Sequence, residues 1–260
     1  QKYALLNLTP KVNEWSVSLL ENNTLEIYGY NGVWEEDENG FEILKEIPEE
    51  LTIPEKLEHN GVTYTVTKIS ESAFANDFYN KKIKKVIIPS TIKEIGDKAF
   101  YNCESLKEVD LSSATSLVRI GDEAFAQNPN LGNLTLPSNL QSIGRKAFAG
   151  NLCMTSINIP SSVNIIEEGT FAASNISSIS NYSSAYIWTN NLLINKNVSD
   201  SSRLEVIYVN PNATFITIPN NVKSISAYAF AGNLNITTID LNQVEVIGTD
   251  AFINSNITNI

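Results

Sequence analysis

Few residues in this sequence could carry out chemistry, and their spacing argues against catalysis. The single histidine, His59, directly precedes Asn60-Gly61, a pair typical of a tight hairpin turn. No nucleophile stands beside it, so we expect a surface turn residue and not a general base. The sequence has no His-Glu-x-x-His pattern, no phosphate-binding loop and no dinucleotide-type glycine pattern. We therefore expect no enzymatic activity and no cofactor.

An acidic run and two cysteines are the remaining chemical candidates. Glu35-Glu36-Asp37 brings hard oxygen ligands together but lacks the alternating spacing of a calcium loop, so no metal site is expected. Cys103 and Cys153 fall two coils apart in the repeat that organises the chain, about 10 Å at ~4.8 Å per strand. A disulfide needs Cα atoms within roughly 7 Å, so both thiols are expected to be free and buried.

The acidic charge is concentrated at one end of the chain. The net charge is −11, and residues 1–60 hold four Lys and thirteen Asp or Glu, a balance of −9. The rest of the chain holds fourteen basic and sixteen acidic groups, a balance of −2. The four lysines between positions 81 and 85 are interpreted as a solvated face, so we expect no nucleic-acid partner. No run of roughly 18 apolar residues occurs, so no membrane span is expected.

A repeat of short units organises most of the chain. Ala-Phe pairs, with one Thr-Phe variant, mark each unit at Phe74, Phe100, Phe125, Phe148, Phe171, Phe230 and Phe252. An Ile lies five residues before each Phe and is often followed by Gly, as in Ile95-Gly96. A small polar residue follows three residues after the Phe, and then an apolar triplet such as Leu106, Val109 and Leu111. Several positions recurring together predict a solenoid of stacked coils.

Each repeated feature has a physical interpretation. The end of the triplet alternates apolar and polar residues, which predicts a half-buried strand. Gly after the Ile permits a turn, and the segment through Ala-Phe is long enough for one or two helical turns. The polar residue after the Phe is expected to turn inward and bond backbone groups. The predicted fold is a strand-rich α/β class, a right-handed leucine-rich-repeat solenoid with short helical turns and one parallel strand sheet. Its inward positions are Val86, Val109, Leu134, Ile157, Ile179 and Ile239.

The block Ile88-Pro89-Ser90-Thr91-Ile92-Lys93-Glu94-Ile95-Gly96-Asp97-Lys98-Ala99-Phe100 resembles the BspA-like class of bacterial surface leucine-rich repeats. The segment His59–Ile69 is similar to the first hairpin of that family. The resemblance covers about residue 51 to the end. It implies a secreted or surface-anchored protein of an anaerobic gut or mouth bacterium, extracellular or attached to the cell surface. It also implies that some relatives adhere to host extracellular proteins, and it supplies no catalytic residues.

The predicted organisation has two parts. Residues 1–50 form an acidic N-terminal cap of β hairpins, in which Ser16–Leu20 and Thr24–Tyr30 pair around a tight turn. Trp15 and Trp34 are expected to be buried against the first coil, and the alternative is a glycan-stacking platform. Residues 51–260 form the solenoid, with a β insertion at about 180–214. The insertion contains a hairpin of 185–189 with 192–196, and strands at 203–209 and 214–218.

The leading functional hypothesis is protein binding at the cell surface, with adhesion to host or matrix proteins through the outward side of the strands. The candidate partner-binding residues are Lys85, Glu108, Asp110, Asn133, Thr135, Ser156, Asn158, Thr217, Thr238 and Asp240. No aromatic or Arg anchor marks a hot spot among them. The alternative is carbohydrate binding, with Tyr182, Tyr186 and Trp188 of the insertion as stacking faces.

The two ends of the chain carry expectations of their own. No apolar leader follows Gln1, so a targeting segment is expected to be missing from this chain. Ile260 falls where Val109 falls in its own coil, part-way through a strand. We expect either that the natural chain continues or that another molecule covers this edge.

Overall fold

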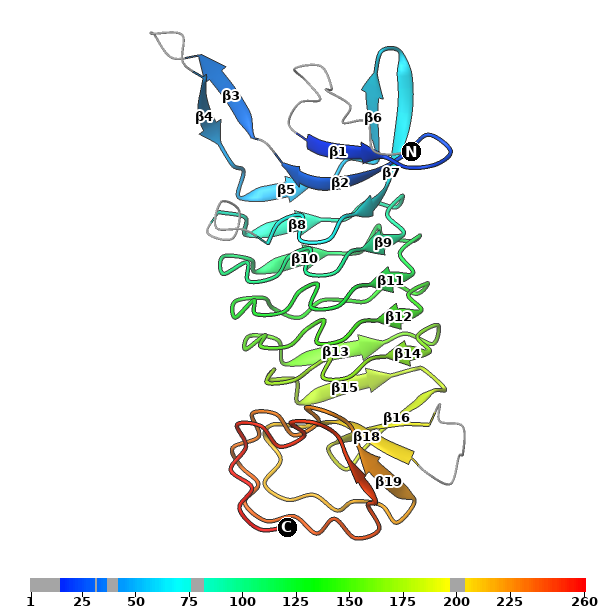
Figure 1. Cartoon of the computed structure of the whole chain (residues 1–260), viewed down its shortest axis with the longest axis vertical. Helices are drawn as coiled ribbons and strands as arrows, with labels where there is room; N and C mark the ends of the chain where they lie inside the picture. The colour runs from blue at the N-terminus through cyan, green and yellow to red at the C-terminus, as the bar shows by residue number, and fades with distance from the viewer. Residues whose placement is uncertain (1–14, 31, 37–41, 76–81, 197–203) are drawn as a thin grey trace.

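The computed structural model describes residues 15–30, 32–36, 42–75, 82–196 and 204–260, and the side chains of 33–36 and 42–46 lie outside the description. The described part is an elongated, strand-rich solenoid of about seven turns (Figure 1). No helix occurs in it, so the prediction of short helical turns was wrong. The handedness of the coil stays a prediction.

One side of the solenoid, which we call the strand face, is formed by the predicted triplet strands. β8 (Lys85–Ile87) pairs in parallel with β5 (Glu50–Thr52) and β10 (Glu108–Asp110). β13 (Ser156–Ile159) pairs in parallel with β15 (Ser178–Asn181). All six predicted inward residues are buried as expected, and the strand pairing places Val109 opposite Val86 and Ile157 opposite Ile179. The single sheet was wrong, because residues 131–136 form no strand and separate the two ladders.

A second parallel sheet, which we call the isoleucine sheet, runs along an adjacent side of the coils. Its strands include β7 (Val62–Ile69) and the two-residue strands β9 (Glu94–Ile95), β11 (Arg119–Ile120), β12 (Ser142–Ile143) and β14 (Ile165–Ile166). The expected turn does begin at the following Gly, since the N–H of Ala99 donates to the carbonyl of Gly96 (3.2 Å). A Cβ added to Gly96 would lie 2.7 Å from the backbone nitrogen of Glu71, so Gly is required by the close approach of the preceding coil.

The Phe side of each coil is irregular because some of its residues have φ angles that a right-handed helix does not allow. The residues two before and two after Phe100, Lys98 and Asn102, both have left-handed φ, and the same alternation recurs at the later Phe positions. A right-handed helix needs an unbroken run of residues with negative φ, so left-handed residues at these positions exclude it. The N–H groups donate instead to the next coil, as from Phe100 to the carbonyl of Ala124 (2.8 Å). The rings from Phe74 to Phe171 stack nearly parallel, 5.0 to 6.2 Å apart.

The expectation of inward polar residues after the Phe is confirmed. Asn128 is fully buried, and its Oδ1 accepts from the N–H of Cys103 (2.6 Å). Its Nδ2 donates to the carbonyls of Phe100 and Phe125, both at 2.9 Å. One side chain thus satisfies three backbone groups that the bends leave unpaired.

The N-terminal strands join the isoleucine sheet. β1 (Trp15–Leu19) and β2 (Thr24–Tyr30) form the expected antiparallel hairpin, and β2 pairs in parallel with β7. β6 (Lys56–His59) pairs antiparallel with β7, which confirms the hairpin around Asn60-Gly61. Trp15 is buried as expected, and its ring packs edge-on against Tyr30 of the same hairpin, with ring centroids 4.9 Å apart. The side chain of Trp34 lies outside the described residues.

The acidic run begins within a strand. Glu35 and Glu36 belong to β3 (Val33–Glu36), which pairs antiparallel with β4 (Glu42–Glu46). Asp37 lies outside the described residues. The boundary of the cap at residue 50 stays a prediction.

The insertion adds strands beside the isoleucine sheet. The central strand, β17 (Leu192–Asn195), pairs antiparallel on one side with β16 (Tyr186–Thr189) and on the other with β18 (Leu204–Val209). β18 then pairs in parallel with β19 (Val222–Ile225), which pairs with β20 (Val246–Ile247). Tyr208 packs edge-on against Phe171 (5.6 Å) and interrupts the ring stack. The strand expected at 214–218 does not form.

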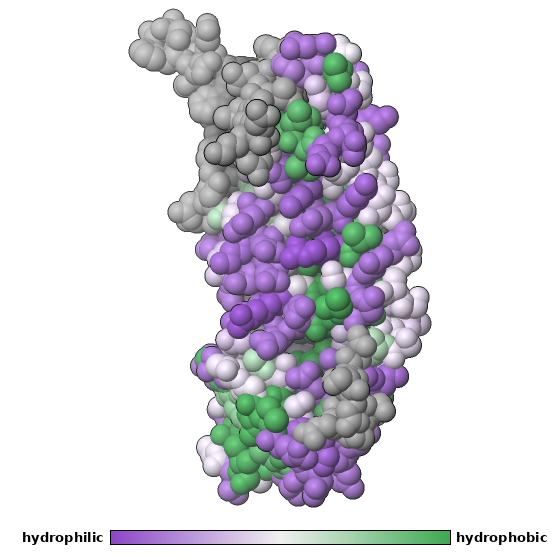
Figure 2. Space-filling model, turned by 45° about the vertical axis from the view of Figure 1, so that its right-hand side comes forward, coloured by the Kyte–Doolittle hydropathy of each residue, from purple (hydrophilic) through white to green (hydrophobic). Residues whose placement is uncertain are grey.

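Apolar side chains become exposed over the C-terminal coils. Figure 2 shows them toward the lower end of the molecule, below a largely hydrophilic middle. The exposed ones in this region are Phe215, Leu234, Val246, Ile247, Ile253 and Ile260. Ile260 is 69% exposed, whereas Val109 at the matching position of its own coil is 5% exposed. The difference follows from stacking, because inner coils are covered on both sides.

Candidate binding surface

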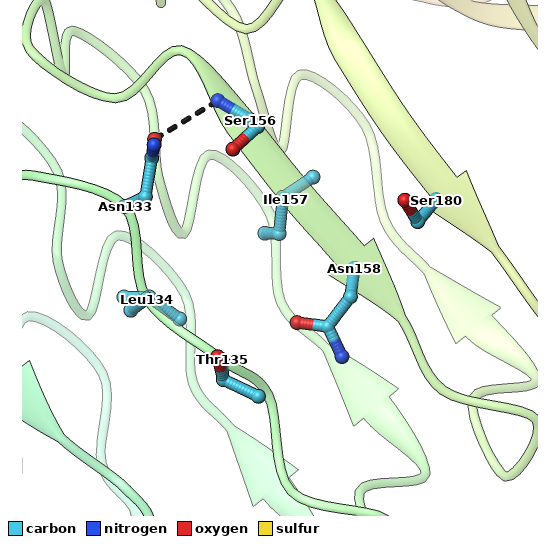
Figure 3. A pocket seen from close by; sticks show the side chains of 7 residues that line it. All are labelled: Asn133, Leu134, Thr135, Ser156, Ile157, Asn158 and Ser180. Atoms are coloured by element: carbon cyan, nitrogen blue, oxygen red, sulfur yellow. Dashed lines mark hydrogen bonds between the residues drawn. The ribbon is translucent and has the colours of Figure 1, made fainter.

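A shallow hollow opens on the strand face where the two ladders are separated. It measures about 220 Å³ and is lined by Asn133, Leu134, Thr135, Ser156, Ile157, Asn158 and Ser180 (Figure 3). Leu134 and Ile157 are buried and form an apolar floor, and the other lining residues are polar and uncharged. Four of the ten predicted partner-binding residues meet here. Ser180 was missed because nothing in the sequence indicates a gap between coils.

At the hollow, two asparagine side chains stand where backbone pairing occurs in neighbouring coils. Asn133 Oδ1 accepts from the N–H groups of Thr155 (2.8 Å) and Ser156 (2.9 Å). Asn158 Oδ1 accepts from the N–H of Leu136 (3.0 Å), and its Nδ2 donates to the Leu136 carbonyl (3.4 Å). These residues were expected to be free for a partner, but their carboxamides are largely occupied within the solenoid.

Several groups at the hollow remain available. Within the described residues, the hydroxyls of Thr135, Ser156 and Ser180 make no hydrogen bond. The main-chain groups of Leu134 and Thr135 likewise have no partner there, although Gly132 still donates to the carbonyl of Lys107 (3.0 Å). Backbone groups near the surface of a sheet are normally paired, so this stretch is an exception.

An exposed aromatic ring stands beside the hollow. Tyr182 is 70% exposed and follows β15 directly. Its N–H donates to the carbonyl of Ile159 (2.9 Å), so the strand geometry continues through it. Side chains two residues apart on a strand share a face, so Tyr182 lies on the same side as Ser180, about 7 Å along the strand. Tyr182 was predicted to belong to the insertion, and an anchor on the strand face was therefore missed.

The strand face nearer the N-terminus carries charged residues that are partly paired with one another. Lys85 Nζ lies 3.0 Å from Glu108 and 4.0 Å from Glu50. The hydrogen bond to Glu108 raises the pKa of Lys85. Asp110 accepts from the N–H of Ser112 (2.9 Å), and hydrogen bonds from Ser112 lower the Asp110 pKa. Lys85 and Glu108 are therefore paired with each other, Asp110 is held by Ser112, and none of these three predicted residues lines the hollow.

The last three predicted residues lie beyond the insertion. Thr217 is exposed in the segment after β18, and Thr238 forms an isolated parallel bridge with Asn259. Asp240 Oδ1 accepts from the N–H of Asn242 (2.8 Å). None of the three lines the hollow. Phe215, which is 75% exposed in the same segment as Thr217, was not predicted.

The aromatic platform proposed for carbohydrate is not assembled as expected. Tyr186 is 3% exposed, and its hydroxyl accepts from the N–H of Ile166 (2.6 Å). Burial raises the pKa of Tyr186 to about 12. Trp188 is half-buried and packs against the main core. Tyr182 alone of the three rings is fully available.

The remaining chemical candidates do not form a second site. Both cysteines are free as expected, but Cys153 is exposed and only Cys103 is buried. Cys103 lies at the inward position three residues after Phe100, whereas Cys153 lies five residues after Phe148, where the coil has turned outward. Over the described ranges, no group of three or more His, Cys, Asp or Glu could hold a metal ion. In the same residues, no helix is long and apolar enough to cross a membrane.

Stacked coils with an apolar triplet strand and a Phe ladder define the leucine-rich-repeat class of solenoids. The sequence-family model described as BspA type leucine rich repeat region matches residues 67–199 and 205–260 of this chain, in six copies. The chain therefore belongs to the BspA-type leucine-rich-repeat family. No curated protein matches the sequence.

Solved bacterial structures have a similar fold. A leucine-rich cell surface protein of Faecalibacterium prausnitzii is 23% identical, with TM-score 0.54, and the match covers 100% of this chain and 76% of that one. A leucine-rich repeat protein of Eubacterium ventriosum is 23% identical, with TM-score 0.68, and the match covers 100% of this chain and 68% of that one. One of Bacteroides ovatus is 24% identical, with TM-score 0.62, over 95% of this chain and 57% of that chain.

Proposed function

We propose that this chain is a non-enzymatic binding module presented at the bacterial cell surface, which adheres to an extracellular protein of a host or matrix. The observation that carries the proposal is Tyr182, an exposed ring beside an uncharged hollow of hydroxyl and amide groups on the strand face. The surface location is supported by family membership and by the relative described as a cell surface protein.

The composition of this surface suits protein recognition. Tyr gives a large, rigid contact area at a small cost in conformational entropy, while Ser, Thr and Asn supply adaptable hydrogen bonds. Energetic hot spots of protein interfaces are enriched in Tyr and lie in desolvated, well-packed pockets. On the N-terminal side of the hollow, Lys85 and Glu108 are already paired with each other, so a partner need not neutralise either of them.

Carbohydrate binding is the second candidate, and one observation favours it. Tyr182 could stack on a sugar ring while the free hydroxyls of Thr135, Ser156 and Ser180 bond to sugar hydroxyls. The buried Tyr186 and half-buried Trp188 weaken it, because a glycan platform would then rest on one ring.

A binding screen with a matched pair of variants tests the proposal. The chain is applied to a panel of purified matrix proteins and to a glycan array. Tyr182→Ala should weaken protein binding by about tenfold or more, as for a hot-spot tyrosine. Tyr28→Ala, at an exposed tyrosine on β2, is the control and should leave it unchanged. Glycan binding lost in Tyr182→Ala would favour the second candidate, and matrix binding equal in both variants would contradict the proposed site.

A further inference from the structure

The strand face is interrupted by its outward side chains and not by a weak strand sequence. Residues 131–136 keep the same apolar alternation as the paired strands, with Leu131, Leu134 and Leu136 all buried. Leu134 thus has the same inward place as Val109 and Ile157, whose strands do pair. The difference lies in the outward residues, where Asn133 and Asn158 both turn into the space between coils.

The carboxamides replace backbone groups with matching chemistry. An Asn side chain carries one carbonyl acceptor and one N–H₂ donor, the same groups as a peptide unit. Asn133 Oδ1 takes two N–H groups of the coil that follows, and Asn158 takes both the N–H and the carbonyl of Leu136. The replacement satisfies the two ends of the segment and leaves Leu134 and Thr135 in the middle without main-chain partners.

We propose that Asn133 and Asn158 are positioning residues that hold these coils open, so that the hollow admits an extended, uncharged peptide segment of the partner, which hydrogen-bonds to the main chain at Leu134 and Thr135. The inference rests on the proposed function and names its partner class. Unpaired N–H and C=O groups in a strand are the features that strand addition uses. The free hydroxyls around them and the apolar floor suit small, neutral side chains.

The open state can be tested without any partner. In the double variant Asn133→Ser with Asn158→Ser, both positions carry the residue that β15 presents outward at Ser178 and Ser180. The coils should then pair directly, and the amides of Leu134 and Thr135 should exchange with deuterium about tenfold more slowly. Asn130→Ser is the control, because Asn130 bridges to Glu104 at the outer edge of the coil. Equal exchange rates in the double variant and the parent protein would overturn the positioning role.

The peptide assignment has its own test. Linear peptides displayed on phage are selected on the parent protein, and the best is synthesised with and without backbone N-methylation. Binding should fall about tenfold or more in the double variant and on N-methylation, while Asn130→Ser binds normally. Failure to select any peptide, or a glycan-array signal lost in the double variant, would overturn the peptide assignment. Matrix binding that needs Tyr182 but persists in the double variant would overturn this inference and leave the proposed function standing.

Discussion

At the scale of single residues, asparagine serves as a backbone substitute at two depths. Asn128 does so in the buried core, where its carboxamide binds the main chain of two coils. Asn133 does so on the strand face, between coils that would otherwise pair directly. The buried case follows from the repeat, since a small polar residue recurs after each Phe. The surface case does not, because an outward Asn looks the same in the sequence whether it faces solvent or a neighbouring coil.

The cysteines allow a direct test of side-chain direction. Burial raises the pKa of Cys103 to about 12, so its thiolate is scarce near neutral pH, and the thiol is also inaccessible. Cys153 is exposed. Titration of the native protein with a thiol reagent at about pH 8 should modify Cys153 rapidly and Cys103 only after denaturation. Cys153→Ser should therefore abolish the native reaction. Rapid native modification of that variant would contradict the inward direction of Cys103.

At the scale of elements, each coil has a strand side, an isoleucine side and a Phe side. The strand side was predictable, because its apolar alternation spans a full strand. The isoleucine sheet was not, because strands of two residues such as β11 are too short to show a period. The Phe side was misassigned as helical because its length fits a helical turn. The left-handed φ of Lys98 has no signature in its residue type, and that of Asn102 has only a weak one, since Asn adopts this conformation more readily than most residues.

The glycine after the isoleucine gives a stability test of coil packing. A Cβ at Gly121 would lie 2.4 Å from Asp97 Oδ1 and 2.6 Å from the Asp97 nitrogen. Gly121→Ala should lower the free energy of unfolding by about 2–3 kcal/mol, because the preceding coil must shift. Gly132→Ala is the matched control, since its Cβ would meet nothing nearer than 3.5 Å and the effect should stay within about 0.5 kcal/mol. Equal midpoints in urea for both variants would show that the coils are not in close contact there.

The insertion carries a pH-sensitive group. Burial raises the pKa of Glu205 in β18, against the opposing effect of hydrogen bonds with Asn195 and Ser226. A carboxyl with a raised pKa binds its proton more tightly in the folded state. Its contribution to stability is therefore complete below the ordinary glutamate pKa and is lost as pH rises through the folded pKa.

Glu205→Gln should remove the loss of stability that the buried carboxyl causes as the pH rises. The variant should be closest to the parent protein below about pH 4 and should gain stability relative to it as the pH rises toward about 7. Urea unfolding midpoints across this range measure the effect. Glu104→Gln, at an exposed position, controls for the loss of one negative charge. A difference that shrinks with rising pH would have the wrong sign and would contradict burial as the cause of the raised pKa.

At the scale of the whole molecule, the net charge and the proposed site belong to different parts of the chain. Residues 1–60 contribute −9 of the net −11, while every residue that lines the hollow is uncharged. Glu50 in β5 and the segment at Asn133 are separated by β8 and β10. Three strand spacings of ~4.8 Å give about 14 Å, which exceeds the ~8 Å screening length at physiological ionic strength. The acidic segment should therefore contribute little to the affinity of a partner held at the hollow.

This separation predicts binding that is nearly independent of salt and of the acidic segment. For a partner found in the binding screen, the dissociation constant should change less than about threefold between roughly 0.05 M and 0.5 M NaCl. Reversal of charge at Glu35, Glu36 and Asp37 should leave it similarly unchanged, because rim or remote charges act mainly on association rate. The introduction of an arginine at Thr135 should by contrast abolish binding, since it fills the hollow with a long charged side chain. A steep loss of affinity with salt, together with sensitivity to the reversed charges and tolerance of Thr135→Arg, would move the binding surface to the N-terminal strands.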